Sequence, residues 1–104
     1  MAHKVRLTER AYAELDEIVA YIAQNAPIAA LTWRDSVWRK VDSLEHFPLR
    51  HGLAPEAEAA GADIRQTLLG VYRILYRVSD DWVTVCGIRH GARRPMRPDE
   101  LPEG

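Results

Sequence analysis

The sequence predicts an α+β fold: a short amino-terminal strand, an antiparallel helical hairpin, and then a three-stranded antiparallel meander, forming one twisted sheet. In the first half of the chain, apolar residues recur every three or four positions, as on one face of a helix. From Asp63 onward, apolar and polar residues alternate, as in strands. A length of 104 residues suits one core. We therefore expect a single domain over residues 1–94 and an irregular tail over residues 95–104.

The first half contains the expected strand and both helices. Residues 3–7 alternate as a short strand, and Thr8 is a suitable N-cap for the helix that follows. That helix should end near Asn25, and Pro27 suits the first turn of the next one, which Pro48 should stop. The apolar positions that define the two helical faces are Ala11, Leu15, Ile18, Ile22, Ala30, Trp33, Val37, Val41 and Leu44.

Three strands are expected after a connector that spans residues 49–62 and contains a helical turn near Glu56. The strands cover residues 64–69, 72–78 and 82–89, with turns between them. A small isolated sheet is not stable in water, so another layer must cover it. We expect the amino-terminal strand and both helices to cover one face, and the other face to be free for binding.

Composition and charge narrow the class of protein. The 47% apolar and 28% charged residues are typical of an ordinary globular protein. A single cysteine, Cys86, is consistent with a reducing compartment, and we expect its thiol to be buried. Residues 1–7 lack the apolar run of a signal peptide, and no stretch reaches the roughly 18 apolar residues of a membrane span. We expect a cytoplasmic protein that has no membrane partner.

Positive charge is concentrated in the second half of the chain. Residues 8–48 hold four bases and seven acids, whereas residues 63–97 hold seven arginines and three acids. Arginine binds carboxylates and phosphates with a planar pair of donors. The candidate binding residues are Arg65, Arg73, Arg77, Arg89, Arg93 and Arg94. The alternative is that these arginines pair internally with acids such as Glu56, Asp63 and Asp80.

His90 is the one histidine in the strand region, and it precedes Gly91. It is a candidate general acid or base, although a histidine at a strand end is more often a structural hydrogen-bonding group. The other histidines, at positions 3, 46 and 51, show no metal-ligand spacing with it. We expect no metal, no cofactor and no small-molecule substrate.

Two runs of residues carry a resemblance to a known family: Tyr-Arg-Ile-Leu-Tyr at 72–76 and Ile-Arg-His-Gly-Ala-Arg at 88–93. Together with the order of elements, they make residues 5–94 similar to the RelE/ParE superfamily of toxins from type II toxin-antitoxin systems. The resemblance implies a helical hairpin packed on a twisted sheet and a cognate antitoxin as partner. It also implies either of two activities, since one fold hosts both.

The RelE-like branch cleaves mRNA on the ribosome, and the resemblance would give Arg73 and Arg93 the phosphate and His90 the proton transfer. The ParE-like branch binds and inhibits DNA gyrase. The present chain resembles this branch more closely in Arg65 and in the run His90–Arg93, and it has no lysine in the strand region. We expect a gyrase inhibitor of the plasmid-stabilisation type. The alternatives are a ribosome-dependent endoribonuclease and a degenerate, non-toxic binding relative.

Overall fold

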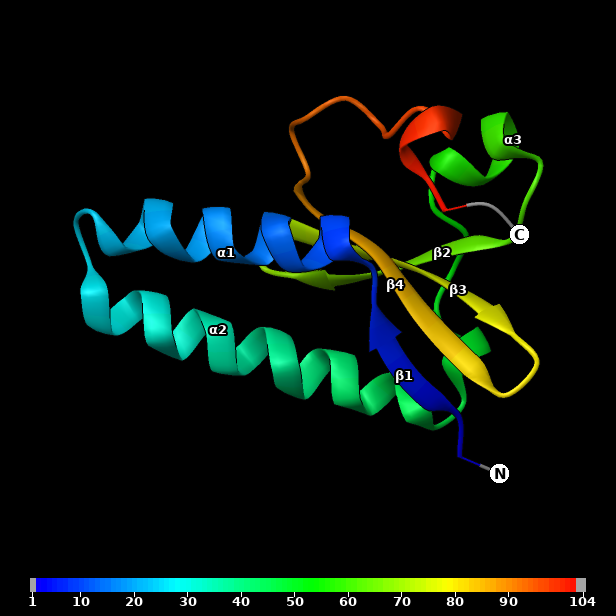
Figure 1. Cartoon of the computed structure of the whole chain (residues 1–104), viewed down its shortest axis with the longest axis horizontal. Coiled ribbons are helices and arrows are strands. Elements are labelled where there is room, and N and C mark those ends of the chain that lie inside the picture. Colours follow the sequence, from blue (N-terminus) through cyan, green and yellow to red (C-terminus); the bar gives the residue numbers. More distant parts are fainter. Residues whose placement is uncertain (1, 103–104) are drawn as a thin grey trace.

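The computed structural model describes residues 2–102 and confirms the α+β fold (Figure 1). Most boundaries of the helices and strands agree with the sequence expectation to within two residues, but the second helix ends at Asp42, short of Pro48, and Leu44 lies in the 3-10 turn that follows it. Short 3-10 turns cover Ser43–Glu45, Pro48–Arg50 and Pro98–Glu100. The main elements are β1 (Lys4–Leu7), α1 (Glu9–Ala23), α2 (Pro27–Asp42), α3 (Glu56–Ala60), β2 (Ile64–Leu69), β3 (Tyr72–Ser79) and β4 (Trp82–His90).

The four strands form one sheet in the order β1-β4-β3-β2. Strands β2, β3 and β4 make the expected antiparallel meander, but β1 pairs with β4 in parallel. The expectation that β1 covers a face of the sheet is therefore wrong. Backbone hydrogen bonds from Lys4 to Asp81 (2.7 Å) and from Thr8 to Val85 (3.0 Å) hold it at the sheet edge instead. Strand β1 thus extends the sheet by one strand.

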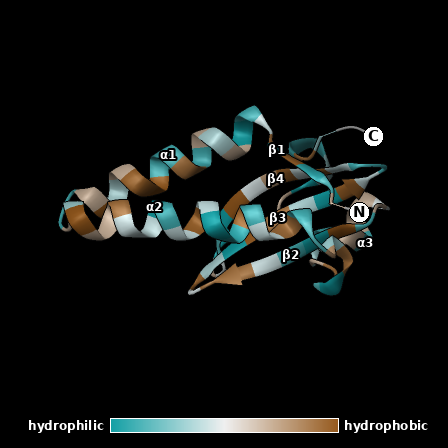
Figure 2. Cartoon of the chain, turned by 90° about the horizontal axis from the view of Figure 1, so that it is seen from below, coloured by the Kyte–Doolittle hydropathy of each residue, from teal (hydrophilic) through white to brown (hydrophobic). Residues whose placement is uncertain are grey.

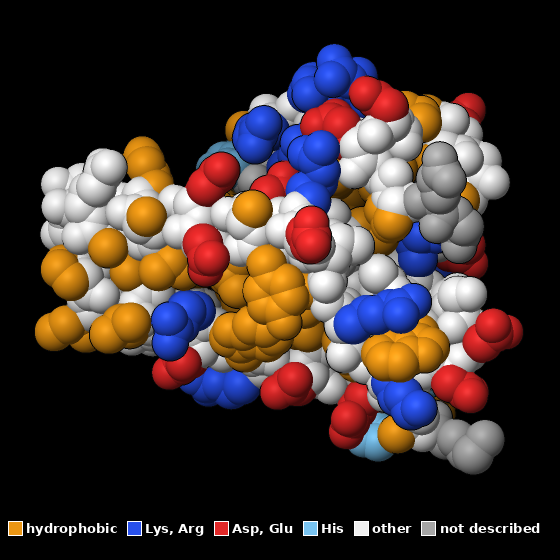
Figure 3. Space-filling view, viewed as in Figure 1, with side chains coloured by type: hydrophobic (Ala, Val, Ile, Leu, Met, Phe, Trp, Pro, Cys, Tyr) orange, Lys and Arg blue, Asp and Glu red, His pale blue; other side chains and the backbone are white. Residues whose placement is uncertain are grey.

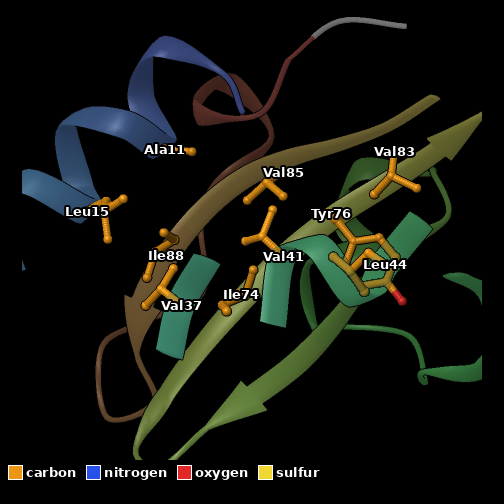
Figure 4. Close-up of a cluster of buried hydrophobic side chains, with 10 residues drawn as sticks. All are labelled: Ala11, Leu15, Val37, Val41, Leu44, Ile74, Tyr76, Val83, Val85 and Ile88. Carbon is orange, nitrogen blue, oxygen red and sulfur yellow. The ribbon is translucent and has the colours of Figure 1, made fainter. Parts of the chain in front are cut away.

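The two long helices cover one face of the sheet, as expected. Thr8 Oγ1 accepts a hydrogen bond from Ala11 N at 3.1 Å and caps α1, and Pro27 occupies the first turn of α2. Figure 2 shows apolar and polar residues alternating along the helices and strands. The buried side chains between the layers come from both helices, β3 and β4 (Figure 4). They are Ala11, Leu15, Val37, Val41, Leu44, Ile74, Tyr76, Val83, Val85 and Ile88.

The opposite face of the sheet is also covered, so the expectation of a free face is wrong. Helix α3 and the segment after β4 lie against it (Figure 1). They enclose a second, smaller core: Ala54, Ala57, Ile64, Leu75, Cys86, Met96 and Leu101. The sequence pattern missed this layer because the layer is built from short segments without periodicity. The domain boundary at residue 94 stays a prediction, but the adjoining segment packs on the domain.

A β-bulge interrupts β4 where Met96 of the second layer lies against the strand. Leu75 pairs with Gly87 and Tyr76 with Val85, so Cys86 is the extra residue. A Cβ atom at position 87 would lie 2.8 Å from Met96 Sδ and 3.0 Å from Glu14 Oε1. Any side chain at this position would therefore require the side chain of Met96, and to a smaller extent that of Glu14, to shift.

Candidate functional site

The register of the sheet divides the predicted site residues between its two faces. Residues directly opposite each other in antiparallel strands project to the same face. Arg73 lies opposite Arg89 and on the same face as Leu75, beneath α3. His90 lies opposite Tyr72, and Arg65 lies opposite Tyr76, which is in the core beneath the long helices. Arg73 and Arg89 therefore project from one face of the sheet, and Arg65 and His90 project from the other.

Arg73 is held in a buried ion pair. Its Nη1 and Nη2 atoms donate to the two carboxylate oxygens of Glu56 in α3, at 3.0 and 2.9 Å, and Nη1 also donates to Gln66 Oε1 at 3.0 Å. The side chains of Arg73 and Glu56 are 9% and 0% exposed. Met96 N donates to the same carboxylate at 2.9 Å. The pair thus joins β3, α3 and the segment after β4.

The ionisation of Glu56 follows from these contacts. Burial raises the pKa of its carboxyl group, but the hydrogen bonds from Arg73 and from Met96 N outweigh burial, so the pKa lies below its usual value. The carboxyl group of Glu56 is therefore ionised near neutral pH. The guanidinium group of Arg73 is bound inside the fold, and its role is structural in this conformation.

Glu100 lies among a second group of arginines, which we call the arginine cluster: Arg10, Arg89, Arg94 and Arg97. Glu100 Oε1 accepts hydrogen bonds from Arg94 Nη1 and from Arg97 N, both at 2.8 Å. Its Oε2 lies 3.7 Å from both Arg10 Nη1 and Arg89 Nη2. Figure 3 shows basic and acidic side chains crowded together over the carboxyl-terminal segment.

Glu100 has an unusually acidic carboxyl group. The hydrogen bond from Arg94, the one from Arg97 N and the surrounding positive charge lower its pKa to about 2. Within the cluster, Arg89 is 1% exposed and donates to Arg94 O at 2.8 Å, and burial lowers its pKa. Arg89 is thus a buried cation whose neighbouring carboxylate comes from the carboxyl-terminal segment.

Two other predicted binding residues also have partners within the fold. Arg65 pairs with Asp63 at 3.0 Å and donates to the carbonyl oxygens of Leu49 and His51. Arg77 donates to Pro102 O at 3.1 Å. A binding role for Arg65, Arg73, Arg77 and Arg89 stays a prediction. In the structure these four arginines contact groups within the fold, which is the alternative that the sequence offered.

The side chain of Arg93 is exposed and forms no hydrogen bond or ion pair with any of residues 2–102. It lines a depression of about 410 Å³ between α1 and the end of β4, together with Ile18, Tyr21, Tyr72 and His90. Tyr21 is 69% exposed at its edge. This depression, which we call the α1–β4 groove, is the candidate binding site.

His90 is oriented within this groove. Its Nδ1 accepts a hydrogen bond from Ala92 N at 3.0 Å, and its ring lies edge-on to Tyr72 at a centroid distance of 5.4 Å. Tyr72 in turn contacts Trp33 of α2 at 5.0 Å. These contacts match the structural alternative weighed for His90. A proton-transfer role stays a prediction.

Glu14 is a site residue that sequence reasoning missed. It sits on α1, and its Oε1 accepts a hydrogen bond from Ile88 N at 3.1 Å, beside the bulge in β4. Burial raises the pKa of its carboxyl group, while Ile88 N and the positive charges of Arg89, Arg10 and Arg93 act in the opposite direction. The residues are 74 positions apart, so no local pattern reveals the contact.

The acidity of Glu100 predicts a dependence of stability on pH. Its pKa is about 2 in the folded chain and near 4.5 otherwise, so its contribution is complete above pH 4.5 and is lost as the pH falls toward 2. Glu100→Gln should therefore flatten the loss of stability between these values. Urea unfolding at a series of pH values measures this. An unchanged slope in the variant would contradict the prediction.

Within residues 2–102 the structure offers two negative findings. No three histidine, cysteine, aspartate or glutamate side chains are placed so that they could hold a metal ion. No helix in this part of the chain is long and apolar enough to cross a membrane.

The fold, a helical hairpin on a four-stranded sheet with an arginine-rich end, is that of a RelE/ParE superfamily toxin. The family model of the ParE toxin of type II toxin-antitoxin systems matches residues 5–95, and the chain belongs to this family. Toxin RelE2 of Caulobacter vibrioides is 37% identical over 87 residues, which cover 83% of this chain and 92% of that protein. The resemblance noted in the sequence is thereby confirmed.

Solved structures share the same fold. The chromosomal ParDE system of P. aeruginosa contains a chain that matches with a TM-score of 0.71 and 21% identity, over 86% of this chain and 96% of that one. The toxin-antitoxin complex RelBE2 of Mycobacterium tuberculosis contains another, with a TM-score of 0.62 and 22% identity, over 86% and 99% of the two chains. Proteins from both named systems therefore have this architecture.

Proposed function

We propose that this protein is the toxin of a type II toxin-antitoxin system that binds and inhibits DNA gyrase without cleaving RNA. The observation that carries the proposal is the position of Arg73. This arginine would have to stabilise a phosphate in a ribonuclease, but it is bound at both terminal nitrogens to Glu56. The family assignment supports the toxin role.

Cleavage of RNA through its 2′-hydroxyl requires a base, an acid and cations around a single phosphate. In this chain Arg73 projects to the face covered by α3, and His90 projects to the face covered by the helices. The sheet lies between them. Arg93 is the one candidate of the three that lies beside His90, and an arginine cannot act as a base because it stays protonated. The arrangement therefore favours binding over catalysis.

The α1–β4 groove has the composition of a protein-binding site. Arginine and tyrosine are enriched among the residues that contribute most of the binding energy at protein interfaces. Arg93 and Tyr21 provide both at the same depression, which Ile18, Glu14 and Glu17 also line. We place the contact with the target in this groove.

A cognate antitoxin is the second partner in the proposal. The solved relatives come from toxin-antitoxin systems of the ParDE and RelBE types, and the family model describes a toxin of the parDE type. We propose that such an antitoxin binds this chain and prevents its action. A short neighbouring gene for a DNA-binding antitoxin, co-purifying with the toxin when both are expressed, is the expected finding.

The target is tested with purified protein in two assays. We expect inhibition of gyrase supercoiling and intact ribosome-bound mRNA. Arg93→Ala should weaken inhibition roughly tenfold, about 1.4 kcal/mol of binding energy, because it removes an exposed cation from the groove without disturbing an internal pair. Arg34→Ala, an exposed arginine on α2, is the matched control and should inhibit like the parent chain.

Other outcomes separate the alternatives. Cleaved mRNA with unaffected supercoiling would overturn the proposal in favour of a ribonuclease. Expression of the chain alone in bacteria adds a third test: filamentation with signs of DNA damage is expected, whereas normal growth would point to a degenerate relative.

A further inference from the structure

A depression of about 420 Å³ lies between the last part of α2 and the edge of β2, and we call it the α2–β2 pocket. Its lining comes from Lys40 on α2, from residues 51–53 before α3, and from residues 66–68 on β2. Strand β2 is at the edge of the sheet, and Figure 2 shows α2 alongside β2 and β3. The α2–β2 pocket shares no lining residue with the α1–β4 groove.

Three side chains of the pocket keep polar groups without partners among residues 2–102. The ammonium group of Lys40 forms no ion pair or hydrogen bond there. Thr67 is 3% exposed, yet its hydroxyl group forms no hydrogen bond and is not sealed from solvent. Neither ring nitrogen of His51 is bonded, and only Nε2 is sealed. With its proton on Nδ1, the neutral ring therefore offers a donor on its accessible side.

The edge of β2 adds a backbone donor. Ile64 O accepts a hydrogen bond from Ala54 N at 2.8 Å, on the side away from β3. Gln66 N donates to Gly52 O at 3.2 Å on the same side. Alternate residues of an antiparallel strand direct their backbone groups the same way, so the N–H group of Leu68 also points outward. No acceptor among residues 2–102 meets it.

Positive charge at the pocket is not neutralised. No carboxylate lines it, and Asp42 and Glu45, the acids that follow Lys40 in sequence, lie outside its lining. The guanidinium group of Arg50 donates to the carbonyl oxygens of residues 43, 46 and 47 and has no carboxylate partner among residues 2–102. Burial, Arg50 and Lys40 lower the pKa of His51, in that order, and no carboxylate opposes them. An anion in the pocket would thus meet a positive potential.

The donors and the rim of the pocket indicate the kind of anion. The donors come from a helix, a loop and a strand, and the tetrahedral oxygens of a phosphate group can accept from several directions, whereas a carboxylate offers two coplanar oxygens. The rim is apolar, because Leu53 and Leu68 are 60% and 56% exposed. It has no partner for a second phosphate, so the pocket suits a terminal phosphate group better than the closely spaced phosphates of a nucleic acid.

We propose that the α2–β2 pocket binds the terminal phosphate group of a small molecule, with Lys40, His51 and Thr67 as side-chain donors and a free amide of β2 as the fourth. The leucine rim contacts the remainder of a phosphate ester, such as the base of a mononucleotide. The ligand is inorganic phosphate if the rim contributes nothing. This site is independent of the toxin's target.

NMR titration of the whole chain near pH 7, at constant ionic strength, tests the proposal with inorganic phosphate as the probe. The amide signal of Leu68 and the ring signals of His51 should shift in a saturable manner. Lys40→Gln should weaken binding at least about tenfold, because it replaces a charge-assisted hydrogen bond by a neutral one. Lys4→Gln is the matched control: it removes the only other lysine, which lies on β1, and should bind like the parent chain.

Further arms of the titration identify the ligand. Thr67→Val removes the buried hydroxyl group, keeps the size of the side chain, and should bind phosphate several-fold more weakly. Adenosine monophosphate should bind more tightly than inorganic phosphate; equal affinity would assign the site to free phosphate. No saturable shift, or equal weakening by Lys40→Gln and Lys4→Gln, would mean that there is no such site. Acetate binding as tightly as phosphate, or an oligonucleotide binding more tightly than the mononucleotide, would overturn the assignment to a terminal phosphate.

Discussion

Arg73→Ala is expected to lower the free energy of unfolding by about 3–5 kcal/mol, because it leaves the fully buried carboxylate of Glu56 without its counter-ion. The effect is a large fraction of the roughly 5–15 kcal/mol that stabilises a domain of ordinary size. Glu56 would keep the hydrogen bond from Met96 N but lose both bonds from the guanidinium group. Urea unfolding near pH 7 measures the loss.

Two further variants are controls for the unfolding measurement on Arg73→Ala. Arg34→Ala removes an exposed arginine from α2 and should change stability by less than about 0.5 kcal/mol. The double change Arg73→Met with Glu56→Leu should recover part of the loss, since apolar residues of similar size often replace a buried pair without penalty, whereas Met96 N loses its acceptor. A stability of Arg73→Ala close to that of Arg34→Ala would show that Arg73 is not part of the folded core.

This prediction changes how toxicity assays on Arg73 should be interpreted. Loss of toxicity in Arg73→Ala is expected even for a gyrase inhibitor, because less of the chain is folded. Loss of toxicity in the double variant at a temperature where it is fully folded would instead indicate direct contact of Arg73 with a target. Arg93 has no such difficulty, because its side chain is exposed and makes no internal pair among residues 2–102.

Ile74→Ala is expected to lower the free energy of unfolding by about 2–5 kcal/mol. Ile74 is 0% exposed on β3 and packs beneath both long helices with Val37 and Ile88 (Figure 4). Removal of its outer carbons leaves a cavity, because two rigid helices and a sheet cannot close over the space. The loss is measured by urea unfolding, with the slope of the transition unchanged.

Val71→Ala is the matched control for this change. Val71 lies in the turn between β2 and β3 and is 62% exposed, so the same kind of truncation removes almost no buried surface. A loss in Ile74→Ala as small as that of Val71→Ala would mean that the main core is not packed as described.

The elements themselves were predictable because their signals are local. Thr8 caps α1 through a bond to a residue three positions away, and Pro27 begins α2 because its ring fixes a helical backbone angle. The alternation of residues 72–78 sets which side chains share a face of β3. Each of these features depends on neighbours along the chain, which the sequence displays directly.

The position of the candidate site was less predictable, because it depends on pairs far apart in sequence. Arg73 and Glu56 are 17 residues apart, and Glu14 and Ile88 are 74 apart. Nothing in the local pattern of either partner indicates the other. The sequence indicated correctly which residues share a face of β3 with Arg73. It did not indicate what covers that face, since Met96 and Leu101 lie in a segment without periodicity.

By itself, the sequence determined the order and type of the elements, the fold class and the family, because periodicity, caps and two short motifs are local properties. Only the tertiary structure decided which arginines are free. Burial against α3 and the carboxyl-terminal segment turns Arg73 and Arg89 into internal cations, whereas Arg93 stays at the surface. The physical reason is that a guanidinium group removed from water must take a carboxylate with it, and the fold determines which carboxylates come within reach.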